Sequence, residues 1–391
     1  MQTRFLLGPA GSGKTFRCLD EIRTALKSSP EGAPLILIAP KQATFQLERQ
    51  LLADESLSGY SRLQIFSFER LADFILTKLQ KSPAKLLSEE GRVMVLRALL
   101  SQNKDKLKIF RSSARMPGFA QQLSLLLREL QRHQLAPATL FKLADQIKNT
   151  TPLRAKLHDL ALLLDAYFDW LKKHELQDAN RLLDLAADAL LVEKQSKNSA
   201  NDIHIAGLWL DGFAEMTPQE INLLAAFAPN CDTATFAFCL DQPSQNETKI
   251  SALSIWSVVG KTFRDCFARL SALPDCKIEI ENLPREMADS RFNTSPVLRH
   301  LENHWTQPKP FPDSADVSNS LRLATCSNPE AEATLAAHEI LQFVRQGGRF
   351  REVALLLRQF NGYHDALRRI FSRYDIPFFL DRRESAAHPP L

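Results

Sequence analysis

The chain has 391 residues, of which 45% are hydrophobic and 24% are charged, and its formal net charge is +4. This composition predicts a folded protein with two or three cores and excludes a disordered chain, and a net charge this small does not by itself indicate a polyanionic partner. No segment reaches the roughly 18 apolar residues of a membrane span, and Met1 leads directly into an expected strand, so we expect no membrane association and a cytoplasmic location.

The first elements predict a strand, a glycine-rich turn and a helix. Residues 3–7 are largely apolar, residues 16–26 have apolar side chains at helical spacing, and Gly8 to Thr15 between them matches the P-loop pattern. Such a turn lets backbone N–H groups and a helix N-terminus face a polyphosphate. The residues expected to bind ATP are Gly8, Gly11, Ser12, Gly13, Lys14 and Thr15, with Lys14 at the phosphates and the Thr15 hydroxyl on Mg²⁺.

The following pattern of strands and helices is interrupted once. Strands are expected at 34–39, 63–66, 203–210 and 233–238, helices at 43–52 and 68–79, and a purely helical stretch from 88 to about 191. We therefore predict a RecA-like parallel-sheet domain (1A) over 1–85, an all-helical insertion (1B-like) over 86–200, and a return to the first domain over 201–305. The six cysteines form no C-x-x-C pair, which favours buried thiols over metal ligands or disulfides.

The last part of the chain predicts a second α/β domain. A proline-rich stretch at 306–318 indicates a linker. Beyond it, strands near 321–324, 353–357 and 377–380 and helices over 330–344 and 363–374 predict the beginning of a second RecA-like domain (2A), truncated, over 319–391. Basic residues cluster at 78–85 and 104–115, a pattern that is usually only a solvated face.

Four segments resemble superfamily 1 helicases, and among them the AddB (RexB) subunits of bacterial AddAB-type helicase–nucleases. Residues 8–15 are similar to motif I, residues 38–48 with Pro-Lys-Gln-Ala-Thr-Phe-Gln look like motif Ia, residues 67–76 are similar to the Thr-Phe-His segment of the helicases, and Arg358 with residues 374–381 looks like motif IV. The resemblance implies an ATP- and DNA-binding subunit that processes DNA double-strand-break ends for recombinational repair beside an AddA-type partner.

The resemblance covers only about the N-terminal third of AddB proteins. Their later helicase motifs, their nuclease domain and its iron–sulfur cluster would lie beyond these residues, so we expect a fragment or a truncated product without catalytic competence of its own. No residue is assigned a catalytic role.

The segment Trp209-Leu210-Asp211-Gly212-Phe213 aligns with the Asp-Glu-Phe segment of the helicases. Asp211 is expected to help orient Mg²⁺, whereas Gly212 replaces the glutamate that would activate water. Loss of one general base typically costs about 10²–10⁴ in rate, so this departure predicts nucleotide binding with weak or no hydrolysis. An alternative is that Glu215 or Glu220 substitutes. By resemblance, Arg358 is a further residue of the nucleotide site.

By resemblance, the segments after the second and third strands hold single-stranded DNA. The side chains expected to contact DNA are Lys41, Gln42, Thr44, Ser67 and Arg70. Phe45 and Phe68 are candidate stacking faces, with core packing as the competing interpretation. Two alternatives to the AddB-like interpretation are an active superfamily 1 helicase motor and a non-catalytic DNA-scanning scaffold with a vestigial ATP site.

Overall fold

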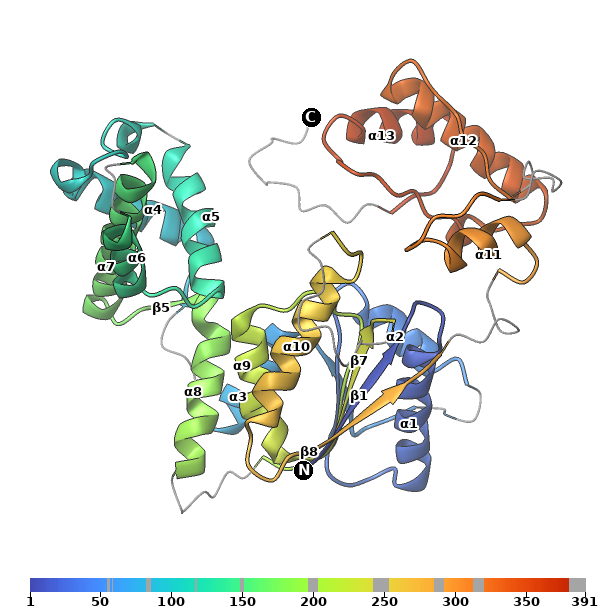
Figure 1. Ribbon diagram of the computed structural model, residues 1–391, viewed down its shortest axis with the longest axis horizontal. Coiled ribbons are helices and arrows are strands. Elements are labelled where there is room, and N and C mark those ends of the chain that lie inside the picture. The colour runs from blue at the N-terminus through green and yellow to red at the C-terminus, as the bar shows by residue number, and fades with distance from the viewer. Residues whose placement is uncertain are drawn as a thin grey trace. The chain divides into compact units, whose positions relative to one another are not determined.

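The computed structural model describes residues 1–54, 57, 59–81, 86–116, 118–147, 151–195, 203–241, 253–284, 292–311 and 320–379 (Figure 1). The chain divides into two compact units, Met1–Thr294 and Ser295–Leu391. Within the described ranges, no helix has both the length and the apolar character needed to cross a bilayer.

A six-stranded sheet forms the centre of the first unit. Its strands are β1 (Gln2–Gly8), β2 (Leu35–Ile38), β3 (Leu63–Phe66), β6 (Ile205–Leu210), β7 (Cys231–Cys239) and β8 (Lys277–Asn282). Their order is β3-β2-β6-β7-β1-β8, and every neighbouring pair is parallel, which confirms the expected α/β class with a parallel sheet. The carboxyl ends of all these strands therefore meet at one edge of the sheet.

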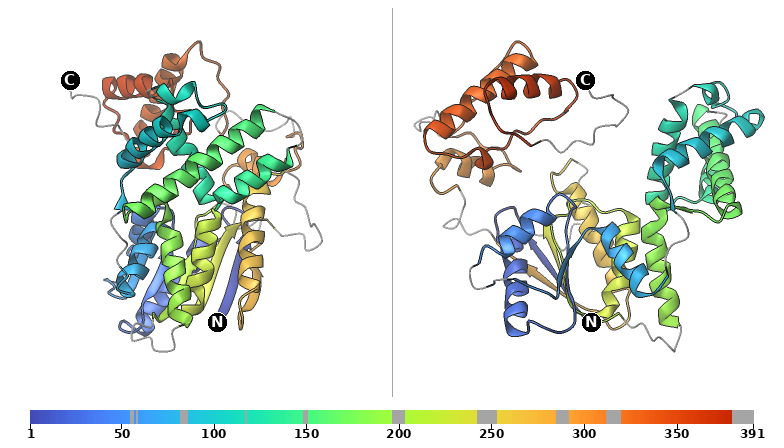
Figure 2. Two further views of the ribbon diagram at one scale, coloured as in Figure 1. Left: turned by 90° about the vertical axis from the view of Figure 1, so that its left-hand side faces the viewer. Right: turned by 180° about the vertical axis from the view of Figure 1, so that it is seen from behind.

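Helices cover both faces of this sheet, because successive side chains of a strand point to opposite faces (Figures 1 and 2). On one face, α1 (Lys14–Ser28) and α2 (Thr44–Leu51) pack against Leu6 and Leu37. On the other, Phe5 and Leu7 belong to the core formed with α3 (Phe68–Lys78), α8 (Leu182–Gln195), α9 (Pro218–Phe227) and α10 (Ser257–Ser271). The adjacent residues Phe5, Leu6 and Leu7 thus contribute to two separate hydrophobic cores, one on each face of the sheet.

A group of helices with its own core follows α3 in the chain. It consists of α4 (Glu89–Gln102), α5 (Phe119–Arg132), α6 (Pro137–Gln146) and α7 (Pro152–Lys173), with the short 3-10 helices η1 (Lys104–Lys106) and η2 (Ser113–Arg115). Its core includes Leu96, Leu127, Leu164 and Tyr167. The chain enters and leaves this group through β4 (Leu86–Leu87) and β5 (Gln177–Asp178), which pair in parallel.

A buried polar cluster stands beside this paired entry and exit. The Arg92 Nη1 atom lies 3.6 Å from Asp178 Oδ1, while Tyr167 and Gln131 donate to Asp178 Oδ2 at 3.0 and 3.1 Å. All four side chains are buried, and a buried charge is tolerated only where it is paired and hydrogen-bonded. Asp178 therefore ties α4, α5 and α7 to β5.

The next helix, α8, packs with the sheet layer although we expected the helical insertion to continue to residue 200. Leu182, Ala186 and Leu190 share a core with α3 and α9. Two further short 3-10 helices in the described part of this unit are η3 (Ala179–Arg181) and η4 (Ala228–Asn230). Strand β8 was not anticipated, although Ile278 and Ile280 alternate with charged residues as an edge strand requires.

The second unit contains α11 (Pro296–Asn303), α12 (Pro329–Arg345), η6 (Phe350–Glu352) and α13 (His364–Arg373). Both helices expected here are present, and Ala337, Ile340, Leu367 and Ile370 join α12 to α13. The expected strands at 321–324 and 353–357 are wrong, as is the described part of the one at 377–380. A strand needs a hydrogen-bonded neighbour, and these segments have no ladder partner among the described residues. Residues 312–318 of the expected linker and residues 380–381 lie outside those ranges.

Candidate functional site

The loop between β1 and α1 lies at the carboxyl edge of the sheet. Gly11 and Gly13 have φ angles of 84° and 87°, a left-handed conformation that costs other residues about 1–2 kcal/mol. Gly13 is also the residue before α1, and no side chain caps that helix. The N-terminal amides of α1 and its positive dipole end are thus arranged to receive an anion.

The Lys14 ammonium folds back over this loop. Its Nζ atom donates to the carbonyl oxygens of Gly8 and Pro9, both at 2.7 Å, and lies 3.4 Å from Ser12 Oγ. The side chain is only 8% exposed. A fixed positive charge is thereby held directly above the glycine-rich turn.

Thr15 and Asp211 meet across the sheet edge. The Thr15 Oγ1 atom donates to Asp211 Oδ2 at 2.6 Å, and the other carboxylate oxygen accepts the Gly212 N–H at 2.9 Å. A hydroxyl beside a carboxylate is a pair of oxygen ligands that suits Mg²⁺. Beneath them, burial raises the pKa of the Cys18 thiol, with the Asp211 charge adding to the effect, so this thiol stays protonated and unreactive.

Gly212 has a backbone conformation that disfavours any side chain. Its φ angle is +86°, and a Cβ atom built there would lie 3.1 Å from Pro40 Cδ. The position expected for a lost glutamate is therefore a left-handed turn at which a side chain would meet Pro40, two residues beyond the end of β2. A side chain introduced here would begin from a strained backbone.

The two substitute carboxylates proposed from the sequence have different surroundings. Glu220 Oε2 accepts hydrogen bonds from the Thr217 N–H and hydroxyl at 2.6 and 3.0 Å, forming the capping box of α9. Burial raises the pKa of Glu220, partly offset by these hydrogen bonds. Glu215 is exposed. The carboxylate of Glu220 is thus occupied in capping the N-terminus of α9.

Lys41, Gln42 and Thr44 follow β2, and Ser67 and Arg70 follow β3, so the parallel strands place both sets at the same sheet edge. Lys41, Gln42 and Arg70 are exposed or partly exposed. Ser67 is buried, and its hydroxyl accepts the Arg70 N–H at 3.4 Å and donates to Glu69 at 2.7 Å. Ser67 therefore acts here as the N-cap of α3.

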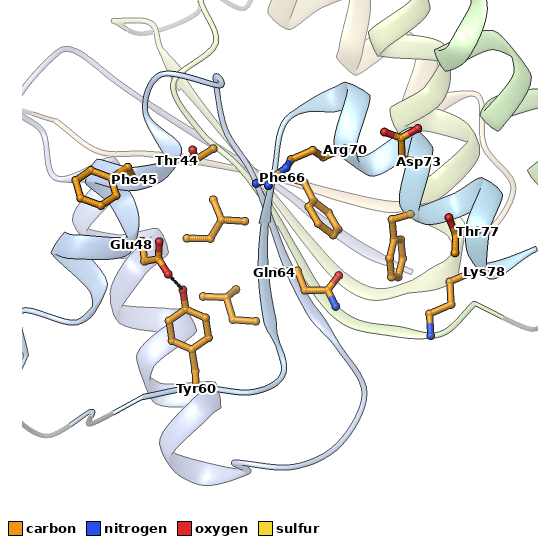
Figure 3. A pocket seen from close by; sticks show the side chains of 13 residues that line it. Thr44, Phe45, Glu48, Tyr60, Gln64, Phe66, Arg70, Asp73, Thr77 and Lys78 are labelled. Carbon is orange, nitrogen blue, oxygen red and sulfur yellow. Dashed lines mark hydrogen bonds between the residues drawn. The ribbon is translucent and has the colours of Figure 1, made fainter. Parts of the chain in front are cut away.

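A groove of about 820 Å³ runs along the open side of β3, between α2 and α3 (Figure 3). Thr44 and Arg70 both line it, which brings together two residues singled out from separate segments. The rings of Phe66 and Phe74, 5.5 Å apart, were not singled out from the sequence. Both rings also pack partly against the core on one face of the sheet, so in the sequence they match ordinary core residues of β3 and α3.

Polar groups at the rim of this groove include Tyr60, whose hydroxyl donates to Glu48 Oε1 at 3.0 Å. Burial and this hydrogen bond raise the pKa of Tyr60 to about 12. Burial, with Glu69 nearby, raises the pKa of Asp73 above its ordinary value. Lys78 Nζ lies 5.9 Å from the centre of the Phe74 ring.

The two phenylalanines considered as stacking faces differ in exposure. Phe68 is 2% exposed and packs edge-on against Phe213 with the ring centres 5.2 Å apart, so it is a core residue. Phe45 is 69% exposed at the groove, so core packing is wrong for this ring. Arg358 lies in the second unit, whereas the site contacts described above all come from the first.

The fold and this edge define an α/β protein with an open parallel sheet and a candidate anion-binding edge. Residues 5–302 match the family described as ADDB, N-terminal. Over its full length the chain is 36% identical to a protein of Heliobacterium modesticaldum that is named as a subunit of an ATP-dependent helicase/deoxyribonuclease, and it covers 32% of that protein. It is 35% identical over 99% of its length to the protein of the same name from Symbiobacterium thermophilum, and it covers 33% of that one.

The chain therefore belongs to the AddB family, which confirms the resemblance drawn from its motifs. It spans about a third of the length of the curated relatives that it matches.

The conformation of Gly212 leads to a stability prediction. Gly212→Ala should lower the free energy of unfolding by about 1–2 kcal/mol, because alanine must adopt the left-handed conformation and its Cβ approaches Pro40. Urea unfolding measures the change. Gly118→Ala is the matched control, since no atom lies within 4 Å of a Cβ built there and its φ is −84°. A Gly212→Ala chain as stable as the control would contradict this account of the turn.

Proposed function

We propose that this chain is the ATP- and DNA-binding part of an AddB-type subunit that acts in processing DNA double-strand-break ends for recombinational repair. The observation that carries the proposal is the contact of Thr15 with Asp211 beside a glycine-rich loop that holds Lys14. The relatives are named as subunits of an ATP-dependent helicase/deoxyribonuclease, which agrees with both ligands and implies a second subunit. We infer that this partner is an AddA-type helicase–nuclease.

The nucleotide phosphates would be held by the loop from Gly8 to Gly13 and by Lys14. To meet them, the Lys14 ammonium exchanges its contacts with two carbonyl oxygens for charged phosphate oxygens, which form stronger hydrogen bonds. Thr15 and Asp211 would orient Mg²⁺, which when bound neutralises charge on the phosphates. Arg358 is retained as a proposed residue of this site on the strength of its motif alone.

The absence of a side chain at Gly212 predicts weak or absent ATP hydrolysis. Water attacking a phosphate must be oriented and deprotonated, and the residue beside Asp211 has no side chain with which to do so. The left-handed turn at Gly212 and the helix-capping role of Glu220 weigh against the active-motor alternative. A scaffold with a vestigial ATP site would differ in failing to bind Mg²⁺-ATP.

Single-stranded DNA would follow the sheet edge and the groove beside β3. Lys41, Gln42 and Arg70 are available there as phosphate donors, and Phe45 offers an exposed ring for stacking. Thr44 lines the same groove. Ser67 would act indirectly, by fixing the start of the helix that carries Arg70.

Binding of the nucleotide can be tested at Lys14. Lys14→Ala should abolish most Mg²⁺-ATP binding measured by calorimetry, because the fixed charge above the loop is lost. Lys27→Ala, at the exposed end of the same helix, is the control and should bind as the wild type does. Circular dichroism reports whether each variant is folded. Equal affinity in the wild type and Lys14→Ala would refute the nucleotide site.

Turnover is the second test. The unmodified chain should hydrolyse ATP barely above background, with or without DNA, when phosphate release is followed. Gly212→Glu should not raise the rate, because its side chain begins from a strained turn. DNA-stimulated turnover by the unmodified chain at rates typical of enzymes, on the order of 1–10³ s⁻¹, would restore the active-motor alternative.

The DNA path can be tested by salt titration. Replacing Lys41 and Arg70 by glutamine should weaken binding of oligo(dT) and reduce the slope of log K against log salt by about 1.4, since each phosphate contact on a single strand contributes about 0.7. Arg269 and Lys277 are the matched control pair, being exposed in the last turn of α10 and at the start of β8. Equal slopes in both double variants would move the path elsewhere.

A further inference from the structure

Twelve residues of the helical group, 104–115, contain five basic side chains and one acidic one. We call this segment the basic loop; it runs from η1 to η2. Its net charge of +4 equals that of the entire chain, so the remaining residues are together neutral. Positive charge is therefore in local excess in this short segment, which lies outside the sheet-edge site.

The basic loop is held in place by a buried carboxylate. Asp159 on α7 is 0% exposed and accepts the successive backbone N–H groups of Lys108, Ile109 and Phe110 at 2.8–3.0 Å. Desolvating a carboxylate is costly unless such bonds replace water. These three backbone N–H groups therefore point toward α7, and their hydrogen bonds to Asp159 fix the conformation of the basic loop.

The same anchoring turns two apolar side chains of the loop inward, although Ile109 stays exposed among the cations. Leu107 is buried in the core of the helical group, and Phe110 packs edge-on against Phe119. The exposed cations are Lys106, Lys108, Arg111 and Arg115, while Lys104 is half-buried. Arg111 pairs with Asp105 at 3.2 Å, but both side chains remain largely exposed, and such a pair contributes little to stability.

This arrangement fits a polyanion whose charges lie on its outside. Single-strand sites combine cations with exposed rings on which bases stack, as at the groove beside β3, where Phe45 is exposed. The one ring of the basic loop, Phe110, is half-buried against Phe119 and offers no stacking face. A duplex has its bases already stacked and presents its phosphates.

We propose that the basic loop binds the sugar–phosphate backbone of duplex DNA, at a place separate from the single-strand path. The inference rests on the proposed function, because it assumes that the chain handles DNA. It adds a second contact surface, for the duplex part of such a DNA end, with Asp159 as the residue that positions it.

The test is a charge-removal triple variant with a matched control. Lys106→Gln, Lys108→Gln and Arg111→Gln together remove three exposed charges from the basic loop. Lys142→Gln, Lys172→Gln and Lys173→Gln remove three exposed charges from α6 and α7 of the same helical group. Fluorescence anisotropy with a duplex closed by hairpins at both ends keeps single-stranded tails out of the measurement.

The basic-loop variant should lower the slope of log K against log salt for this duplex by about 2–3, at about 0.9 per lost phosphate contact. The control variant should keep the wild-type slope, and oligo(dT) binding should be unchanged in both, which also shows that they are folded. An unchanged duplex slope, or an equal loss of oligo(dT) binding, overturns the inference. A wild-type chain that binds oligo(dT) but no duplex overturns this inference alone, whereas one that binds neither overturns the proposed function as well.

Discussion

The parallel direction of the six strands is the constraint on which the candidate site depends. Because every strand ends at the same edge, loops that are distant in sequence must gather there. Thr15 and Asp211 are 196 positions apart, yet their side chains share a hydrogen bond of 2.6 Å. Strand β7 lies between the strands that carry them, so this contact reaches over one strand. A site of this kind is formed only when β1, β7 and β6 have paired.

The turn at Gly212 changes what the absence of a glutamate means. A glycine at this position could be a simple loss of function on an otherwise intact catalytic turn. The left-handed backbone, and the closeness of Pro40 to the place where a Cβ atom would lie, show instead a turn whose conformation and surroundings suit a residue without a side chain. Asp211 keeps its place because the Gly212 N–H holds one of its oxygens. Under the proposed function, ATP binding and ATP hydrolysis would therefore be separable properties of this edge.

The helical group uses two buried carboxylates in different ways. Asp178 joins a guanidinium, a phenol and an amide at the point where the chain enters and leaves. Asp159 receives backbone amides and shapes the basic loop. Each compensates for the loss of water by several hydrogen bonds. Together they make the helical group a structured platform, so that exposed cations are presented from a defined backbone.

The sequence by itself determined the parallel α/β class, most elements of the first unit, and the family, because apolar periodicity and glycine-lysine spacing are local properties. It could not decide that Phe68 is buried and Phe45 exposed, since both follow a strand and differ only in what packs on them. Nor could it assign α8 to the sheet layer. The pairing of β8 and the presence of the groove beside β3 depend on which strands lie at the edges of the sheet. Whether the extended segments of the second unit form strands depends on hydrogen-bonded neighbours. Those outcomes were decided by tertiary structure, because neighbours distant in sequence supply the hydrogen bonds and the burial.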